Sequence, residues 1–196
     1  MRRATCCGLL ALLAGLAGCS QPAPAPPPEP AAAKTELPQF RASATVRELM
    51  QSLVAPSAQG IWDSVGTVSN AKGTVNLEPR TDAEWAAVRR HAVALLESTN
   101  LLLIPGRHIA PAGSQVNQAE DAAPGSELPP AEIEKLMIAG WPAWIGMAHA
   151  LHDSASMIIE EIDNKDPRGL ERVGSDLDAV CESCHLTFWY PNQPKR

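Results

Sequence analysis

The chain has no cysteine between Cys19 and Cys181. This absence excludes a disulfide framework across the body of the protein, because only Cys181 and Cys184 remain beyond the first 19 residues. A closed zinc site is also unsupported, since such sites use four ligands and the sequence has no second C-x-x-C or H-x-x-x-H pair. There is likewise no P-loop, no plausible Ser/His/Asp arrangement and no recognisable pair of catalytic carboxylates. We therefore expect no enzymatic activity.

Basic residues are also scarce, with 16 Lys and Arg against 22 Asp and Glu and a formal net charge of −6. No basic patch with interleaved aromatic residues occurs anywhere in the chain. Nucleic acids and anionic lipid surfaces attract cationic proteins, so this balance argues against binding either of them through charge.

The N-terminus lacks the run of about 20 apolar residues that would span a bilayer. It has two arginines within the first three residues, and a shorter apolar run at residues 8–17, as secretory signal peptides do. The sequence Leu16-Ala17-Gly18-Cys19 then resembles the bacterial lipobox. We expect residues 1–18 to be a lipoprotein signal peptide and Cys19 to receive a diacylglyceryl group. An ordinary signal peptide cut near Gly18 is the alternative.

Residues 19–40 contain a proline-rich stretch, Gln21-Pro-Ala-Pro-Ala-Pro-Pro-Pro-Glu-Pro30. Proline lacks the N–H that a helix needs, so this segment is expected to be an extended, semi-rigid tether. A proline-rich ligand for a partner protein is the less favoured interpretation. With a lipid on Cys19, the protein would be exported to the bacterial periplasm and held on a membrane by its N-terminal lipid only.

The most specific motif lies near the C-terminus, where Cys181-Glu182-Ser183-Cys184-His185 has the form C-x-x-C-H. This spacing is the attachment signature of a c-type haem. Two thiols form thioether bonds with the haem vinyl groups, and the adjacent histidine becomes an axial ligand of the iron. A helix places positions i, i+3 and i+4 on one face, so all three side chains can reach one porphyrin. We expect one covalent haem c, with Cys181, Cys184 and His185 as its binding residues.

Other uses of the motif fit less well. A thiol–disulfide redox motif begins a helix in a β-α-β setting, and no such pattern surrounds this one. A structural disulfide between Cys181 and Cys184 would leave His185 unexplained. Haem attachment also requires export, which the N-terminal signal independently predicts.

Residues 41–196 are long enough for one domain, and their hydrophobic periodicity predicts four helices and no strand. The first covers about residues 43–68, with Pro56 expected to kink or split it. Its expected apolar stripe includes Val46, Leu49, Met50 and Leu53. The second opens with a capping-box pattern at residues 81–84 and ends near Pro105-Gly106. Its expected core positions include Trp85, Val88, Ala92, Leu95 and Leu102.

A long polar loop is expected between residues 105 and 129. The third helix opens at Pro129-Pro130, with a break or kink at Pro142. The fourth opens at Asp166-Pro167, an N-cap followed by proline at the first helical position. Its expected core stripe is Leu170, Val173, Leu177, Val180, Cys184 and Phe188.

A haem motif on the last of four helices resembles the class II c-type cytochromes, the cytochrome c-prime family. The resemblance covers about residues 41–190 and is specific at Cys181, Cys184 and His185, with support from the aromatic Phe188. It implies an all-α four-helix bundle with haem attached near the C-terminal end of the fourth helix. Trp189 stands where the family often has a basic residue. Class I cytochromes, in contrast, carry the motif near the N-terminus and take a methionine ligand from downstream.

No methionine follows His185, so any sixth ligand from the protein must lie upstream. The resemblance implies two alternatives: an open distal site that binds small gases, or a methionine on the first helix. Met50 is placed like the methionine of the second group, although a methionine on an apolar stripe is often only core filling. Arg47 resembles the basic residue that pairs with a haem propionate in relatives. Lower-ranked candidates are Met137, Met147, Met157, His91, His108, His149 and His152.

Together these features predict a membrane-tethered monohaem cytochrome that carries electrons by outer-sphere transfer. Its partners would be other exported redox proteins, and relatives often pair through helices one and two, so a homodimer is an implied assembly. The alternative is a five-coordinate gas-binding protein for NO or CO. A weaker alternative is a non-haem helical lipoprotein with a structural role.

Overall fold

The computed structural model describes residues 40–115 and 127–192. The predicted signal peptide, Cys19 and the proline-rich tether up to residue 39 lie outside the described residues. The described part is predominantly helical and carries one small hairpin, so the expected all-α class holds at this level. None of its helices is both long enough and apolar enough to cross a membrane.

The first helix runs without interruption from Val46 to Trp62. It comprises α1 (Val46–Leu49), a π-helical turn η1 (Met50–Val54) and α2 (Ala55–Trp62). Pro56 cannot donate a hydrogen bond, and in a regular α-helix its ring would clash with the carbonyl four residues earlier. The π turn widens the helix just before Pro56, where the Ala55 N–H donates to the carbonyl of Met50, five residues back. Of the expected kink or split at Pro56, the split does not occur. The local distortion is the π turn, whose extra residue accommodates the proline within one helix.

The π turn changes which side of the helix faces the core. The sequence pattern predicts Leu53 on the buried stripe, but Leu53 is 36% exposed while Val54 is only 5% exposed. A π turn bonds i to i+5, so the buried position after Leu49 falls five residues later instead of four. The prediction that Leu53 is buried is therefore wrong, because the π turn changes the local geometry of the backbone.

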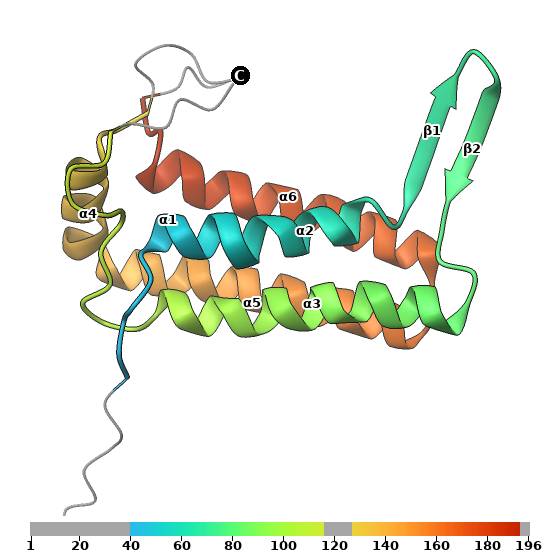
Figure 1. The fold of residues 1–196 in the computed structure, drawn as a ribbon, viewed down its shortest axis with the longest axis horizontal. Coiled ribbons are helices and arrows are strands. Elements are labelled where there is room, and N and C mark those ends of the chain that lie inside the picture. Colours follow the sequence, from blue (N-terminus) through green and yellow to red (C-terminus); the bar gives the residue numbers. More distant parts are fainter. Residues whose placement is uncertain (1–39, 116–126, 193–196) are drawn as a thin grey trace, which may run out of the picture. The chain divides into compact units, whose positions relative to one another are not determined.

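Residues 66–77 form a β-hairpin that the sequence analysis missed. Strands β1 (Gly66–Asn70) and β2 (Gly73–Leu77) pair antiparallel, with Val68 opposite Val75. Gly66 and Gly73 have φ values of +129° and +124°, a conformation that residues with a side chain rarely adopt. The first helix therefore ends at Trp62 and not near residue 68. The hairpin projects from the helical body (Figure 1) and nearly all its residues are exposed.

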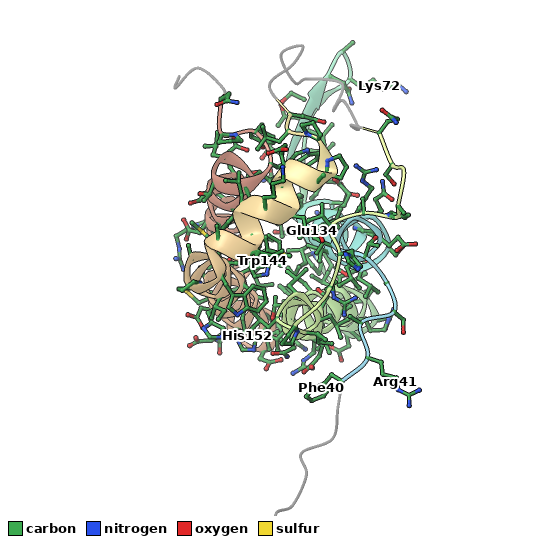
Figure 2. All side chains as sticks on the ribbon, turned by 90° about the vertical axis from the view of Figure 1, so that its left-hand side faces the viewer. Phe40, Arg41, Lys72, Glu134, Trp144 and His152 are labelled. Atoms are coloured by element: carbon green, nitrogen blue, oxygen red, sulfur yellow. The ribbon has the colours of Figure 1, made fainter. Side chains whose placement is uncertain are left out.

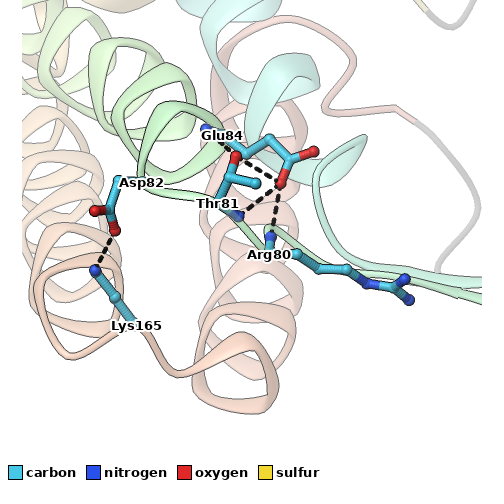
Figure 3. Close-up of polar contacts among 5 residues, drawn as sticks. All are labelled: Arg80, Thr81, Asp82, Glu84 and Lys165. Carbon is cyan, nitrogen blue, oxygen red and sulfur yellow. Dashed lines mark hydrogen bonds and ion pairs between the residues drawn. The ribbon is translucent and has the colours of Figure 1, made fainter.

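Helix α3 (Asp82–Leu102) begins where the capping-box pattern predicts. The Thr81 hydroxyl accepts from the Glu84 N–H, and the Glu84 carboxylate accepts from the N–H groups of Arg80 and Thr81 (Figure 3). Lys165, in the turn that precedes the last helix, forms an ion pair with Asp82 at 2.5 Å. Hydrogen bonding to Lys165 lowers the pKa of the Asp82 carboxyl. This ion pair therefore connects the start of α3 with the turn that precedes the last helix.

The predicted break before Pro142 is confirmed. Helix α4 (Pro130–Ala139) ends at Gly140, and α5 (Trp141–Asp163) begins directly after it. Helix α6 (Pro167–Phe188) starts with Asp166 as its N-cap, as predicted, with the side chain accepting from the Arg168 N–H. Helix one, α3, α5 and α6 lie side by side, while α4 crosses their end near the start of α1 (Figures 1 and 2).

Most predicted core residues are buried. The shared interior contains side chains from every long helix, among them Ile61, Trp85, Leu95, Trp144, Ile158, Leu170 and Leu177. In the described part of the expected loop over residues 105–129, Arg107 and Ile109 are buried. Residues 116–126 of that loop lie outside the described residues. Ile109 joins the apolar core, while Arg107 donates to the carbonyls of Leu101 and Ala44. These contacts bring the loop against the beginning of helix one.

Candidate functional site

A cavity of about 440 Å³ lies between helix one, α4, α5 and α6. Its volume is within the range of roughly 300–1,000 Å³ that is typical of pockets for cofactors and other small molecules. Figure 2 looks at the end of the molecule that α4 crosses, with Glu134 and Trp144 labelled. The lining is mainly apolar and includes Val46, Val54, Leu102, Ile133, Trp144 and Leu151.

Cys181, Cys184 and His185 all line this cavity. They lie on one face of α6, because residues at positions i, i+3 and i+4 share a face of an α-helix. All three side chains are partly buried, and both cysteines are free thiols. Burial, reinforced by the charge of Asp178, raises the pKa of Cys181 to about 11. Burial likewise raises the pKa of Cys184 to about 11, and burial lowers the pKa of His185. The neutral forms of all three are therefore favoured at pH 7.

Met50 and Arg47 line the same cavity from helix one. Met50 is the first residue of the π turn, a rare distortion that often occurs at functional sites. Helix one is fixed against α6 by the Trp62 indole N–H, which donates to the Gly174 carbonyl at 2.8 Å. All five predicted cofactor-binding residues thus come together at one cavity, although 131 positions separate Met50 from Cys181 in the numbering.

Arg47 holds its position through both backbone and side chain. Its N–H donates to the Ile109 carbonyl at 2.9 Å, and its guanidinium donates to the Gln115 carbonyl at 3.1 Å. Within residues 40–115 and 127–192, no carboxylate forms an ion pair with Arg47. A cation at the edge of an apolar cavity can bind an anionic substituent of a ligand inside it.

Ile109, in the segment that follows α3, also lines the cavity. The His108 and Ile109 carbonyls accept from the first N–H groups of helix one. Glu134 on α4 in turn accepts from the Ile109 N–H at 3.1 Å and contacts the His108 ring nitrogen at 2.9 Å. The hydrogen bond with His108 lowers the pKa of Glu134. This network holds the start of helix one, which carries Arg47 and, one turn later, Met50.

The lower-ranked candidates separate clearly by position. Met147 on α5 lines the cavity, and its sulfur is 3.9 Å from the Ser183 hydroxyl, whereas Met137 belongs to the core and Met157 is 45% exposed. The described residues contain no group of three or more His, Cys, Asp or Glu side chains that could hold a metal, so His149 and His152 do not belong to such a group. Met147 is therefore the second thioether that can reach a ligand in the cavity.

Two aromatic residues beside His185 were not predicted as site residues. The Trp189 ring meets the His185 ring edge-on, with centroids 4.9 Å apart and planes at 90°. The Tyr190 ring centroid is 5.9 Å from that of His185, and its hydroxyl donates to Glu182 at 2.6 Å. Burial and the hydrogen bond to Glu182 raise the pKa of Tyr190. The i, i+4 spacing of His185 and Trp189 was the available sequence signal.

These residues fit a covalently attached haem. Two thiols and an imidazole come from one helix face, a thioether comes from a different helix, and apolar side chains form most of the wall between them. Neither family models, nor curated proteins, nor solved structures give a match to this chain. The assignment therefore depends on the motif and on the geometry of the cavity.

Proposed function

We propose that this protein is a membrane-tethered monohaem c-type cytochrome that carries electrons, built as a class II-type four-helix bundle. The observation that carries the proposal is the meeting of Cys181, Cys184, His185 and Met50 at one apolar cavity. Only His185 lies next to the attachment cysteines in sequence. Met50 reaches the same cavity through the fold.

When bound, the haem would supply an iron that alternates between the ferrous and ferric states. Cys181 and Cys184 would hold it through thioether bonds, and His185 would be the proximal ligand. Met50 would be the distal ligand, where a soft thioether favours the ferrous state. Arg47 would pair with a propionate. The apolar wall excludes water, which further favours the less charged ferrous centre.

The remaining parts of the proposal concern location and partners. A lipid on Cys19 would anchor the protein in the periplasm, and residues 20–40 would hold the haem domain away from the membrane. Exported redox proteins would then exchange electrons with it while it stays tethered. A homodimer through helix one and α3 belongs to the same analogy with class II cytochromes.

The test uses the full chain, expressed with an export and haem-attachment system. We expect covalent haem that survives acidic organic extraction, and a low-spin spectrum in both oxidation states that carbon monoxide does not change. The double variant Cys181→Ala, Cys184→Ala is the control and should lose covalent haem. A chain without haem absorption would reject the proposal. A five-coordinate spectrum that shifts with carbon monoxide would support the gas-binding alternative instead.

A further inference from the structure

The chain folds back over the proximal histidine immediately after α6 ends. The N–H groups of Trp189 and Tyr190 both donate to the His185 carbonyl, at 2.8 and 3.0 Å. The Trp189 carbonyl accepts from the Leu128 N–H at 2.9 Å, which ties this turn to the segment that leads into α4. Both aromatic rings are therefore held against the imidazole by backbone bonds on each side.

The core also fixes this turn. Phe188, the last residue of α6, is 4% exposed and meets the Trp144 ring edge-on with centroids 5.2 Å apart. Trp144 is itself anchored, since its indole N–H donates to the Leu102 carbonyl at 3.0 Å. With Phe188 fixed in this way, Trp189 has little freedom to move away from His185.

Tyr190 adds a polar element to the same arrangement. Its hydroxyl donates to the Glu182 carboxylate at 2.6 Å, and Glu182 lies three residues before His185 on α6. Residues three apart on a helix share a face, so this bond keeps a negative charge close to the imidazole. The Trp189 and Tyr190 rings also contact each other, with centroids 5.5 Å apart.

We propose that Trp189 and Tyr190 form a proximal cap that positions the His185 ring and sets how much water and charge reach it. Trp189 fixes the plane of the imidazole and shields it, while Tyr190 holds the Glu182 carboxylate beside it. This inference rests on the proposed haem function. It assigns positioning roles to two residues whose rings contact the ring of the proposed ligand histidine. Trp189 also lines the cavity itself.

The two parts of the cap predict shifts of opposite sign. Removal of Trp189 admits water to His185, which stabilises the more highly charged ferric centre and lowers the midpoint potential. Removal of the Glu182 charge destabilises the ferric centre and raises the potential. In Tyr190→Phe the carboxylate is free to turn into solvent, where its field is screened, so the potential rises by less than in Glu182→Gln.

The experiment measures midpoint potential, electron paramagnetic resonance of the ferric protein, and haem content in the full haem-loaded chain. Trp189→Ala should lower the potential and change the g-values, because the imidazole plane is released. Trp189→Phe keeps an edge-on ring and should restore both. Leu186→Ala is the matched control, since Leu186 is next to His185 on α6 but 42% exposed. It should change neither measurement.

Several outcomes would overturn the cap. One is an unchanged potential and unchanged g-values in haem-loaded Trp189→Ala, and another is an equal change in Leu186→Ala. If Trp189→Ala does not fold, Tyr190→Phe and Glu182→Gln decide the question, and unchanged potentials in both reject the role of the carboxylate. Failure of the proposed function is distinguishable, because the wild-type protein would then contain no haem, or would contain a five-coordinate haem whose spectrum shifts with carbon monoxide.

Discussion

The N–H of Ala55 donates to the carbonyl of Met50, five residues earlier, and this bond defines the π turn in helix one. The turn lies directly before Pro56, whose ring a regular α-helix would not accommodate without a kink. It also contains three of the helix-one residues that line the cavity, Met50, Gln51 and Val54. The position of the proposed sixth ligand therefore depends on a proline that does not line the cavity.

Replacement of Pro56 should test this dependence. In Pro56→Ala the helix can return to α-helical bonding, and loss of the extra residue rotates its two ends relative to each other by about 100°. We expect the Leu53 side chain to become buried and the Met50 side chain to point away from the cavity. The haem-loaded variant should become high-spin and bind carbon monoxide, without a loss of thermal stability. Ser52→Ala is the control substitution, because Ser52 is exposed, lies in the π turn and does not line the cavity, and the change leaves Pro56 in place. A low-spin Pro56→Ala protein would show that the π turn is not needed.

Met50 itself can be tested with a near-isosteric change. Met50→Leu should preserve packing at a cost below about 1.5 kcal/mol, but it removes the thioether. We expect a five-coordinate ferrous spectrum and new binding of carbon monoxide. Met157→Leu serves as the comparison, because Met157 is exposed. If Met50→Leu stays low-spin and Met147→Leu does not, the sixth ligand is Met147.

The Glu134 network should stabilise the protein in a pH-dependent way. Its pKa is lowered in the folded state, so its contribution is fully present above the ordinary value of 4.5 and is lost as the pH falls through the folded value. Glu134→Gln mimics the protonated form. Denaturant unfolding should show a loss of about 1 kcal/mol at pH 7 and a smaller difference from wild type at pH 3.5.

Glu132 offers the matched control for that measurement. It lies on the same helix and pairs only with Lys135 at the surface in the part of the chain that the structure describes, at 2.7 Å. Exposed pairs of this kind contribute little, so Glu132→Gln should be nearly neutral at both pH values. An equal loss in both variants would mean that general charge on α4, and not the bonds to His108 and Ile109, accounts for the effect.

The cap of α3 should affect stability without affecting the site. Thr81→Ala removes the hydroxyl that accepts from Glu84, and loss of such an N-cap costs about 0.5–2 kcal/mol. Thermal unfolding should reveal this loss, while the haem spectrum stays as in wild type. Thr81→Ser retains the hydroxyl and should recover most of the stability. A spectral change in Thr81→Ala would indicate that the far end of α3 communicates with the cavity.

Local sequence signals located several helix boundaries correctly. The Thr81 and Asp166 caps and the break before Pro142 are determined by hydrogen bonding and proline geometry within a few residues. The hairpin was missed because Val68 and Val75 are exposed. Its strands therefore lack the alternation of apolar and polar residues that marks a half-buried strand. Leu53 was misplaced because hydrophobic periodicity assumes bonding from i to i+4, and a π turn breaks that assumption.

The sequence by itself determined the chemistry: two cysteines and a histidine at helical spacing, in a chain with few other cysteines. Only the tertiary structure decided which distant groups share their cavity. It brought Met50 and Arg47 from helix one, added Met147 from α5, and turned Trp189 and Tyr190 back over His185. The reason is physical. Spacing along one helix is fixed by the backbone, whereas contacts between helices depend on how entire buried faces pack together.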